Sequence, residues 1–200
     1  MKPIYQLIKL NRALSNRRIK IAGVLLADLL GVRHLFVRLD PILACNLRCA
    51  MCHFSDPRFR RTNTGMLSMA DIRRIGRQLF PRTLQFVLGC GAEPTLHPGF
   101  VDTIALAKEQ GVPFVSLVTN AQKLEAAALH RLGELRLDEI VVSLHGVHRA
   151  TYEHLMVNAS YPKLHRVLDT LSTMNRDRRD RSPSLRLNYT VNPDNLAELQ

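Results

Sequence analysis

Short apolar runs alternate with longer segments of helical periodicity over most of the chain, and few folds are compatible with this pattern. Apolar runs of that length are typical of buried strands. They cover residues 35–43, 84–88, 113–118, 139–144 and 185–191. Strands that alternate with helices pair in parallel through right-handed crossovers. We therefore predict an α/β fold, an incomplete parallel (β/α) barrel of the TIM-like type.

The segments between the runs carry the start and stop signals of helices. Ser68, followed three residues later by Asp71, resembles a capping box that opens a helix toward Leu79. The segment 100–110 is followed by Gly111, the residue type that favours a helix C-terminus. Further helices are predicted over 124–132 and 164–174, and residues 195–200 are expected to begin one more.

The first 33 residues are expected to form an N-terminal helical extension, and residues 34–200 the core domain. The apolar stretch 19–31 contains Asp28 and is too short to span a bilayer. We expect an amphipathic helix there, which packs on the domain or makes peripheral contact with a membrane surface.

The chain is basic, with a formal net charge of +11. Such a charge suits an anionic partner, but it bears on steering more than on function. The basic clusters at 17–20, 58–61 and 176–181 lack the interleaved aromatic residues of a single-strand binding groove. A nucleic-acid partner is therefore not expected.

The cysteines indicate a metal site. Three of the four, Cys45, Cys49 and Cys52, lie within eight residues, and Cys90 stands alone. Such crowding does not resemble a secreted disulfide framework, so we expect a reducing cytoplasm. The spacing C-x3-C-x2-C places three thiolates within reach of one cluster. A structural zinc site needs a fourth ligand, for which His53 and Cys90 are the candidates.

A second motif makes the triplet recognisable. The segment GAEPTLHP at 91–98 follows the second predicted strand. Together with the cysteine triplet it resembles the radical S-adenosylmethionine (radical SAM) superfamily, over roughly residues 35 to 195. The residues of both motifs are most similar to those of the branch that contains peptide maturases and molybdenum-cofactor cyclases. Barrels of this family typically have six strands, so the last one is expected to lie beyond residue 200.

The resemblance implies a specific chemistry. Cys45, Cys49 and Cys52 would hold a 4Fe-4S cluster, and S-adenosylmethionine would chelate the fourth iron. Reductive cleavage would release methionine and a 5′-deoxyadenosyl radical that abstracts hydrogen from a substrate. The cofactors supply this chemistry, and the protein positions and shields them. A reducing donor of the flavodoxin or ferredoxin type is implied, with a peptide, protein or small molecule as substrate.

The resemblance also assigns residues at the carboxyl ends of the strands, where barrel enzymes gather their functional groups. The predicted cofactor-binding residues are Met51, Gly91, Ala92, Glu93, Thr119, Asn120, Ser143 and Asn192. Glu93 suits the ammonium group of the methionine moiety. His145 stands where relatives often have an acidic residue, and it is either a substrate contact or proton donor or a structural histidine. Turn formation is an alternative role for Asn120 and Asn192.

A second class of function is compatible with the triplet. An electron-transfer or sensor protein could hold the same cluster without ever meeting S-adenosylmethionine. Such a protein needs neither Glu93 nor Ser143, so these two residues favour the radical enzyme.

Overall fold

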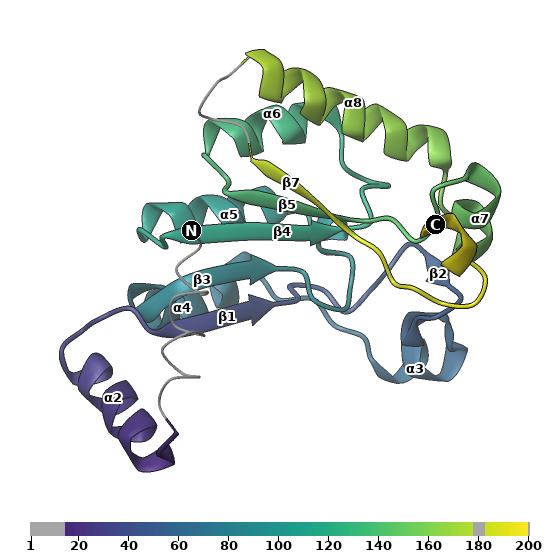
Figure 1. Ribbon diagram of the computed structural model, residues 1–200. Helices are drawn as coiled ribbons and strands as arrows, with labels where there is room; N and C mark the ends of the chain where they lie inside the picture. The colour runs from purple at the N-terminus through teal and green to yellow at the C-terminus, as the bar shows by residue number, and fades with distance from the viewer. Residues whose placement is uncertain (1–14, 178–182, 200) are drawn as a thin grey trace.

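The protein was analysed as a computed structural model, which describes residues 15–177 and 183–199. Its centre is a sheet of five parallel strands in the order β1-β3-β4-β5-β7 (Figure 1). These strands are β1 (Leu35–Leu39), β3 (Thr83–Leu88), β4 (Phe114–Thr119), β5 (Glu139–Ser143) and β7 (Ser184–Asn188). Each strand pairs with the next one of this series along the chain. This order is that of a barrel, because a doubly wound sheet reverses direction at a switch point.

Helices connect consecutive strands, as the alternating pattern predicts. They are α4 (Met69–Leu79), α5 (Phe100–Glu109), α6 (Ala126–Glu134) and α8 (Tyr161–Asp177). The capping box is present, since the Ser68 Oγ accepts from the Asp71 N–H at 3.1 Å and donates to its carboxylate at 2.7 Å. The predicted α/β architecture of a partial parallel barrel is confirmed.

The core lies between the sheet and these helices. The middle strands β3, β4 and β5 are mostly buried, whereas β7 is exposed along its whole length. The rings of Phe80 and Phe86 pack edge to face with centroids 4.9 Å apart, and both are fully buried. Burial of this kind holds the strands in register and so fixes where each one ends.

The first strand is shorter than predicted. Its pairing stops at Leu39, four residues before the end of the apolar run. The carboxylate of Asp40 instead accepts backbone N–H groups from the loop after β3. Leu43 continues the apolar run in sequence only, because its side chain is exposed.

Several short elements were not predicted, because a segment of two to seven residues shows too little periodicity. They are the strands β2 (Arg48–Cys49) and β6 (Met156–Val157), the helices α3 (Pro57–Thr62) and α7 (Arg149–Leu155), and the 3-10 turns η1 (His53–Ser55), η2 (Phe80–Arg82) and η3 (Pro94–Leu96). The segment 195–200, predicted to begin a helix, forms the 3-10 turn η4 (Leu196–Leu199), with residue 200 outside the described residues.

Helix α2 (Arg17–Leu29) projects from the rest of the molecule (Figure 1). It has no buried residue, and Leu25, Leu26 and Leu29 are exposed. Asp28 forms an ion pair with Arg82 at the start of the sheet. None of the described helices is long and apolar enough to cross a membrane. The predicted extension before residue 15 lies outside the described residues, and both the boundary at residue 33 and the peripheral membrane contact stay predictions.

Candidate functional site

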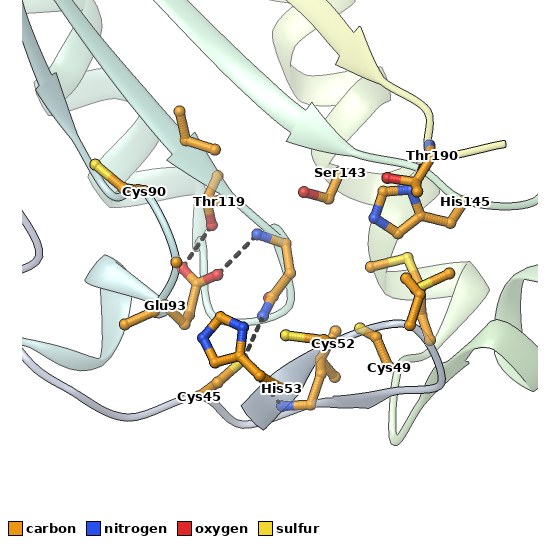
Figure 2. Close-up of a pocket in the computed structure, with 17 residues that line it drawn as sticks. Cys45, Cys49, Cys52, His53, Cys90, Glu93, Thr119, Ser143, His145 and Thr190 are labelled. Atoms are coloured by element: carbon orange, nitrogen blue, oxygen red, sulfur yellow. Dashed lines mark hydrogen bonds between the residues drawn. The ribbon is translucent and has the colours of Figure 1, made fainter. Parts of the chain in front are cut away.

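A pocket of about 320 Å³ opens at the carboxyl ends of the strands (Figure 2). Its wall combines the cysteine triplet, the loop after β3 and the ends of β4 and β5. The lining residues are Cys45, Leu47, Cys49, Met51, Cys52, His53, Cys90, Gly91, Ala92, Glu93, Val118, Thr119, Asn120, Ser143, His145, Met156 and Thr190. The fold therefore brings together every predicted site residue except Asn192.

The cysteine loop is held by backbone pairing and by one buried side chain. Arg48 and Cys49 pair antiparallel with Val157 and Met156, and the Ala50 N–H donates to the Leu155 carbonyl at 2.8 Å. Leu47 is 1% exposed and belongs to the main core. Consequently the loop has a defined position opposite the strand ends.

Cys45 and Cys49 are half-buried, which disfavours their thiolates. Burial raises the pKa of Cys45, and it raises the pKa of Cys49 to about 12. Binding of iron must therefore displace protons from the free thiols.

The donor set suits an iron–sulfur cluster. Cys45, Cys49 and Cys52 all line the pocket, and iron–sulfur clusters are held by cysteine thiolates that each bind a different iron. Across residues 15–177 and 183–199, no group of three or more histidine, cysteine, aspartate or glutamate side chains is placed to hold a single metal ion.

Glu93 is the buried acid of the pocket, with 2% of its surface exposed. Its Oε1 accepts from the Thr119 hydroxyl at 2.7 Å, and its Oε2 accepts from the Asn120 N–H at 2.8 Å (Figure 2). Thr95 donates to Oε1 through both its hydroxyl and its N–H. Burial raises the pKa of Glu93, while these donors oppose the rise. The carboxylate is thus held rigidly and suits a cationic group in the pocket.

Asp40 organises the turn that carries Gly91 and Ala92. Its carboxylate accepts the N–H groups of Cys90, Gly91 and Ala92 at 2.7, 3.2 and 3.4 Å. This contact explains why the backbone of the turn lies against the pocket, a role that sequence reasoning did not assign to Asp40.

Asn120 forms the turn that the sequence offered as an alternative to cofactor binding, and its role in cofactor binding stays a prediction. Its Oδ1 accepts the N–H of Gln122 at 3.0 Å, which is an Asx turn, and its Nδ2 donates to the side chain of Asn46 at 3.0 Å. Its Nδ2 also lies 3.8 Å from the Cys45 sulfur. Asn120 therefore connects the end of β4 to the cysteine loop.

His145 and Ser143 form the wall opposite the cysteines, together with Thr190 (Figure 2). The Nδ1 of His145 lies 3.0 Å from the backbone nitrogen of Thr190, which can only donate. Nδ1 is therefore the acceptor, and the proton of the neutral ring is on Nε2. Burial lowers the pKa of His145, so the ring stays neutral and can donate from Nε2.

The pH dependence of stability tests this state of His145. Because the pKa of His145 is lower in the folded protein than in the unfolded chain, His145 binds a proton more tightly when the chain is unfolded. The wild type should lose stability as the pH falls below about 6.5, the value of an unperturbed histidine. His145→Asn keeps an acceptor for the Thr190 N–H but cannot titrate. This variant should therefore lack the part of the stability loss that comes from protonation of His145. Urea unfolding of both proteins between pH 5 and 8 measures the difference, and parallel curves would contradict the assignment.

Asn192 lies outside the set of lining residues. Its Oδ1 accepts the Asp194 N–H at 3.0 Å, which is the turn role considered as an alternative. Its Nδ2 is buried without a hydrogen-bond partner in the described part of the chain. A role in cofactor binding stays a prediction for this residue.

Six lining residues are not among the predicted cluster-binding, cofactor-binding or catalytic residues, although His53 and Cys90 were considered as a fourth zinc ligand: Leu47, His53, Cys90, Val118, Met156 and Thr190. His53 directly follows the triplet, and this adjacency could have placed it there. Thr190 and Met156 come from segments far along the chain, and only the pairing of β5 with β7 and of β2 with β6 brings them in.

Comparison with known families agrees with this geometry. A family model described as the radical SAM superfamily matches residues 40–189. The chain belongs to the radical SAM superfamily. The family assignment predicted from the cysteine triplet and the GAEPTLHP segment is thereby confirmed.

Several curated proteins are similar to this radical SAM chain. A probable GTP 3′,8-cyclase of Saccharolobus solfataricus is 32% identical over 112 residues, which cover 56% of this chain and 35% of the relative. The GTP 3′,8-cyclase of Chlorobaculum tepidum is 28% identical over 149 residues, 74% of this chain and 44% of the relative. The chain spans less than half the length of these relatives.

Solved structures share the fold. SuiB of Streptococcus suis, bound to the precursor peptide SuiA, superposes with a TM-score of 0.65 at 19% identity, over 98% of this chain and 47% of SuiB. The protein anSMEcpe with bound AdoMet and a peptide gives a TM-score of 0.57 at 16% identity, over 76% of this chain and 41% of that one. At these identities the likeness supports the radical SAM fold.

Proposed function

We propose that this protein is a radical SAM enzyme that binds a 4Fe-4S cluster on Cys45, Cys49 and Cys52 and cleaves S-adenosylmethionine reductively. The observation that carries the proposal is that the three cysteines and the buried Glu93 line one pocket. When bound, the cluster and S-adenosylmethionine supply an electron and a 5′-deoxyadenosyl radical, which abstracts hydrogen from a substrate. The substrate is a peptide, protein or small molecule.

The chain's own residues bind and orient the cofactor in this proposal. Glu93 accepts hydrogen bonds from the methionine ammonium, because its carboxylate is preorganised by Thr119 and Asn120. The exposed Gly91, and Ala92 beside it, let the backbone approach the methionine moiety closely. Ser143 bonds the ribose, and Met51 packs near the adenine.

His145 is proposed as a donor toward an oxygen of the cofactor or substrate. Its Nδ1 is occupied by the Thr190 N–H, so Nε2–H is the group left for a ligand. A neutral histidine in this state orients an acceptor without changing its own charge.

An electron-transfer or sensor protein is the alternative use of the same cluster. Glu93 disfavours it, because a buried acid raised in pKa by burial is costly and a passive cluster does not need it.

Reconstitution tests the proposal. The protein is loaded with iron and sulfide under anaerobic conditions, reduced with dithionite and mixed with S-adenosylmethionine. We expect 5′-deoxyadenosine and methionine in equal amounts. A cluster that forms and is reduced but never yields 5′-deoxyadenosine would support the alternative and contradict the enzyme.

Glu93→Gln should weaken S-adenosylmethionine binding by about 30-fold or more, the factor that corresponds to about 2 kcal/mol for a buried charge pair. Whichever way the glutamine amide is turned, its nitrogen would also face a backbone donor, either the Asn120 N–H or the Thr95 N–H. Equilibrium dialysis with labelled S-adenosylmethionine measures the affinity. Glu139→Gln is the matched control, because Glu139 is equally buried but bonds to Arg186 and lies at the amino end of β5. Equal losses in both variants would mean that only stability is affected.

A further inference from the structure

Helix α3 presents a cluster of unpaired positive charge. Arg58, Arg60 and Arg61 are exposed, and none has an acidic side-chain partner in the described part of the chain. The one acidic residue of the segment 56–61 is Asp56, whose carboxylate caps the helix by accepting the Arg58 N–H at 2.7 Å. We call Arg58, Arg60 and Arg61 the α3 arginines. Three unpaired cations on one short helix form a local field that attracts an anionic surface.

The α3 arginines are connected to the cysteine loop by packed rings. Phe59, between them in the helix, contacts the His53 ring edge to face with centroids 4.4 Å apart. His53 directly follows Cys52 and lines the pocket. The Ser55 hydroxyl donates to the Cys49 carbonyl, which ties the intervening turn to the same loop. The positive surface therefore lies on the outer side of the cysteine loop, at the end of the molecule that carries β2 (Figure 1).

We propose that the α3 arginines are the docking surface for an acidic one-electron carrier protein. This inference rests on the proposed function, since that function requires one electron for each cleavage. The reduced carrier donates one electron to the cluster and is itself oxidised. That electron passes through the cluster to the sulfonium, whose carbon–sulfur bond breaks into methionine and the 5′-deoxyadenosyl radical.

Charge complementarity favours such a partner over the others. The surface is small and charged, as transient redox encounters are, with no exposed large apolar side chain between Asp56 and Thr62. The net charge of +11 extends the attraction beyond the surface itself. Electrostatic steering raises association rates without demanding a large interface. An acidic substrate peptide could also occupy the α3 arginines, and the experiment distinguishes it from a carrier protein.

Binding of a flavodoxin of net negative charge tests the surface directly. We expect the oxidised flavodoxin to bind the protein in calorimetry at low ionic strength and to be released by salt. The triple variant Arg58→Glu, Arg60→Glu, Arg61→Glu should bind at least about tenfold more weakly. The matched control reverses three other exposed cations, Lys123, Lys163 and Arg166, two of them on α8 at the far side of the molecule from α3 (Figure 1). It changes the net charge equally and should keep most of the affinity.

Cleavage driven by different reductants adds a second readout. With reduced flavodoxin, the α3 triple variant should form 5′-deoxyadenosine with a KM for flavodoxin raised at least about tenfold. With dithionite, an anion, or reduced methyl viologen, a cation, its rate should match that of the wild type. Equal losses with all three reductants would overturn the docking role and point to damage at the pocket.

The outcomes separate the two proposals. Wild-type protein that cleaves with dithionite but neither binds flavodoxin nor uses it overturns the docking surface and leaves the enzyme intact. The docking surface is also overturned if the α3 variant binds flavodoxin as tightly as the wild type, or if the control loses as much affinity as the α3 variant. An acidic peptide is then the occupant to examine. Flavodoxin binding that depends on the α3 arginines, without cleavage under any reductant, supports the surface and contradicts the proposed enzyme.

Discussion

Cys49→Ala is expected to lower both iron uptake and 5′-deoxyadenosine formation by more than about 100-fold, because loss of a metal ligand should exceed the cost of losing an outer-shell partner. The backbone of Cys49 still pairs with Met156 in this variant, and its half-buried side chain, which packs against the core, loses only its sulfur atom. The fold should therefore survive, so that the loss reports on the cluster. Iron and sulfide content after anaerobic reconstitution, and product by chromatography, are the measurements.

Cys90→Ala is the control for this prediction. Cys90 lines the same pocket but is exposed, and its contact with Asp40 is made by the backbone N–H. We expect iron uptake and product close to wild type. An equal loss in the Cys90 variant would make it a fourth ligand and would contradict an open iron for S-adenosylmethionine.

The sequence was sufficient to predict that three cysteines lie close together and that the fold is a parallel α/β barrel, for different physical reasons. Three thiols within eight residues must lie close together whatever the fold. Alternating strands and helices leave few arrangements, because crossovers are right-handed and neighbouring strands pair. Glu93 could be assigned through the resemblance to the family motif, and its place in the loop after β3 agrees, because the carboxyl ends of parallel strands share one edge.

Other parts of the site depend on contacts between segments that carry no local signal. The β2–β6 pairing joins Arg48 to Val157 across more than one hundred residues, and two-residue strands have no periodicity to read. Thr190 reaches His145 only through the register of β5 against β7. The tautomer of His145 follows from that contact, so it could not be inferred from the histidine itself.

Gly89→Ala is expected to destabilise the protein by about 3 kcal/mol or more, through strain and overpacking together. Gly89 has φ of +89°, in a region that residues with a Cβ rarely adopt. A Cβ there would lie 2.5 Å from the Val118 carbonyl oxygen and 2.8 Å from the Pro94 ring. Neither neighbour can rotate away, because one is backbone in β4 and the other is a buried proline. The midpoint of urea unfolding measures the loss.

Gly91→Ala, two residues along the same turn, separates the requirement of the fold from that of the pocket. A Cβ at Gly91 would meet nothing nearer than the Asp40 carboxylate at 3.8 Å and the His53 ring at 4.0 Å. The free energy of unfolding of this variant should stay within about 0.5 kcal/mol of wild type. If S-adenosylmethionine approaches the backbone at Gly91, the same variant should bind it more weakly while remaining folded. Two glycines in one turn would then be required for different reasons, Gly89 by the strand packing and Gly91 by the ligand. Equal destabilisation by both substitutions would contradict that division.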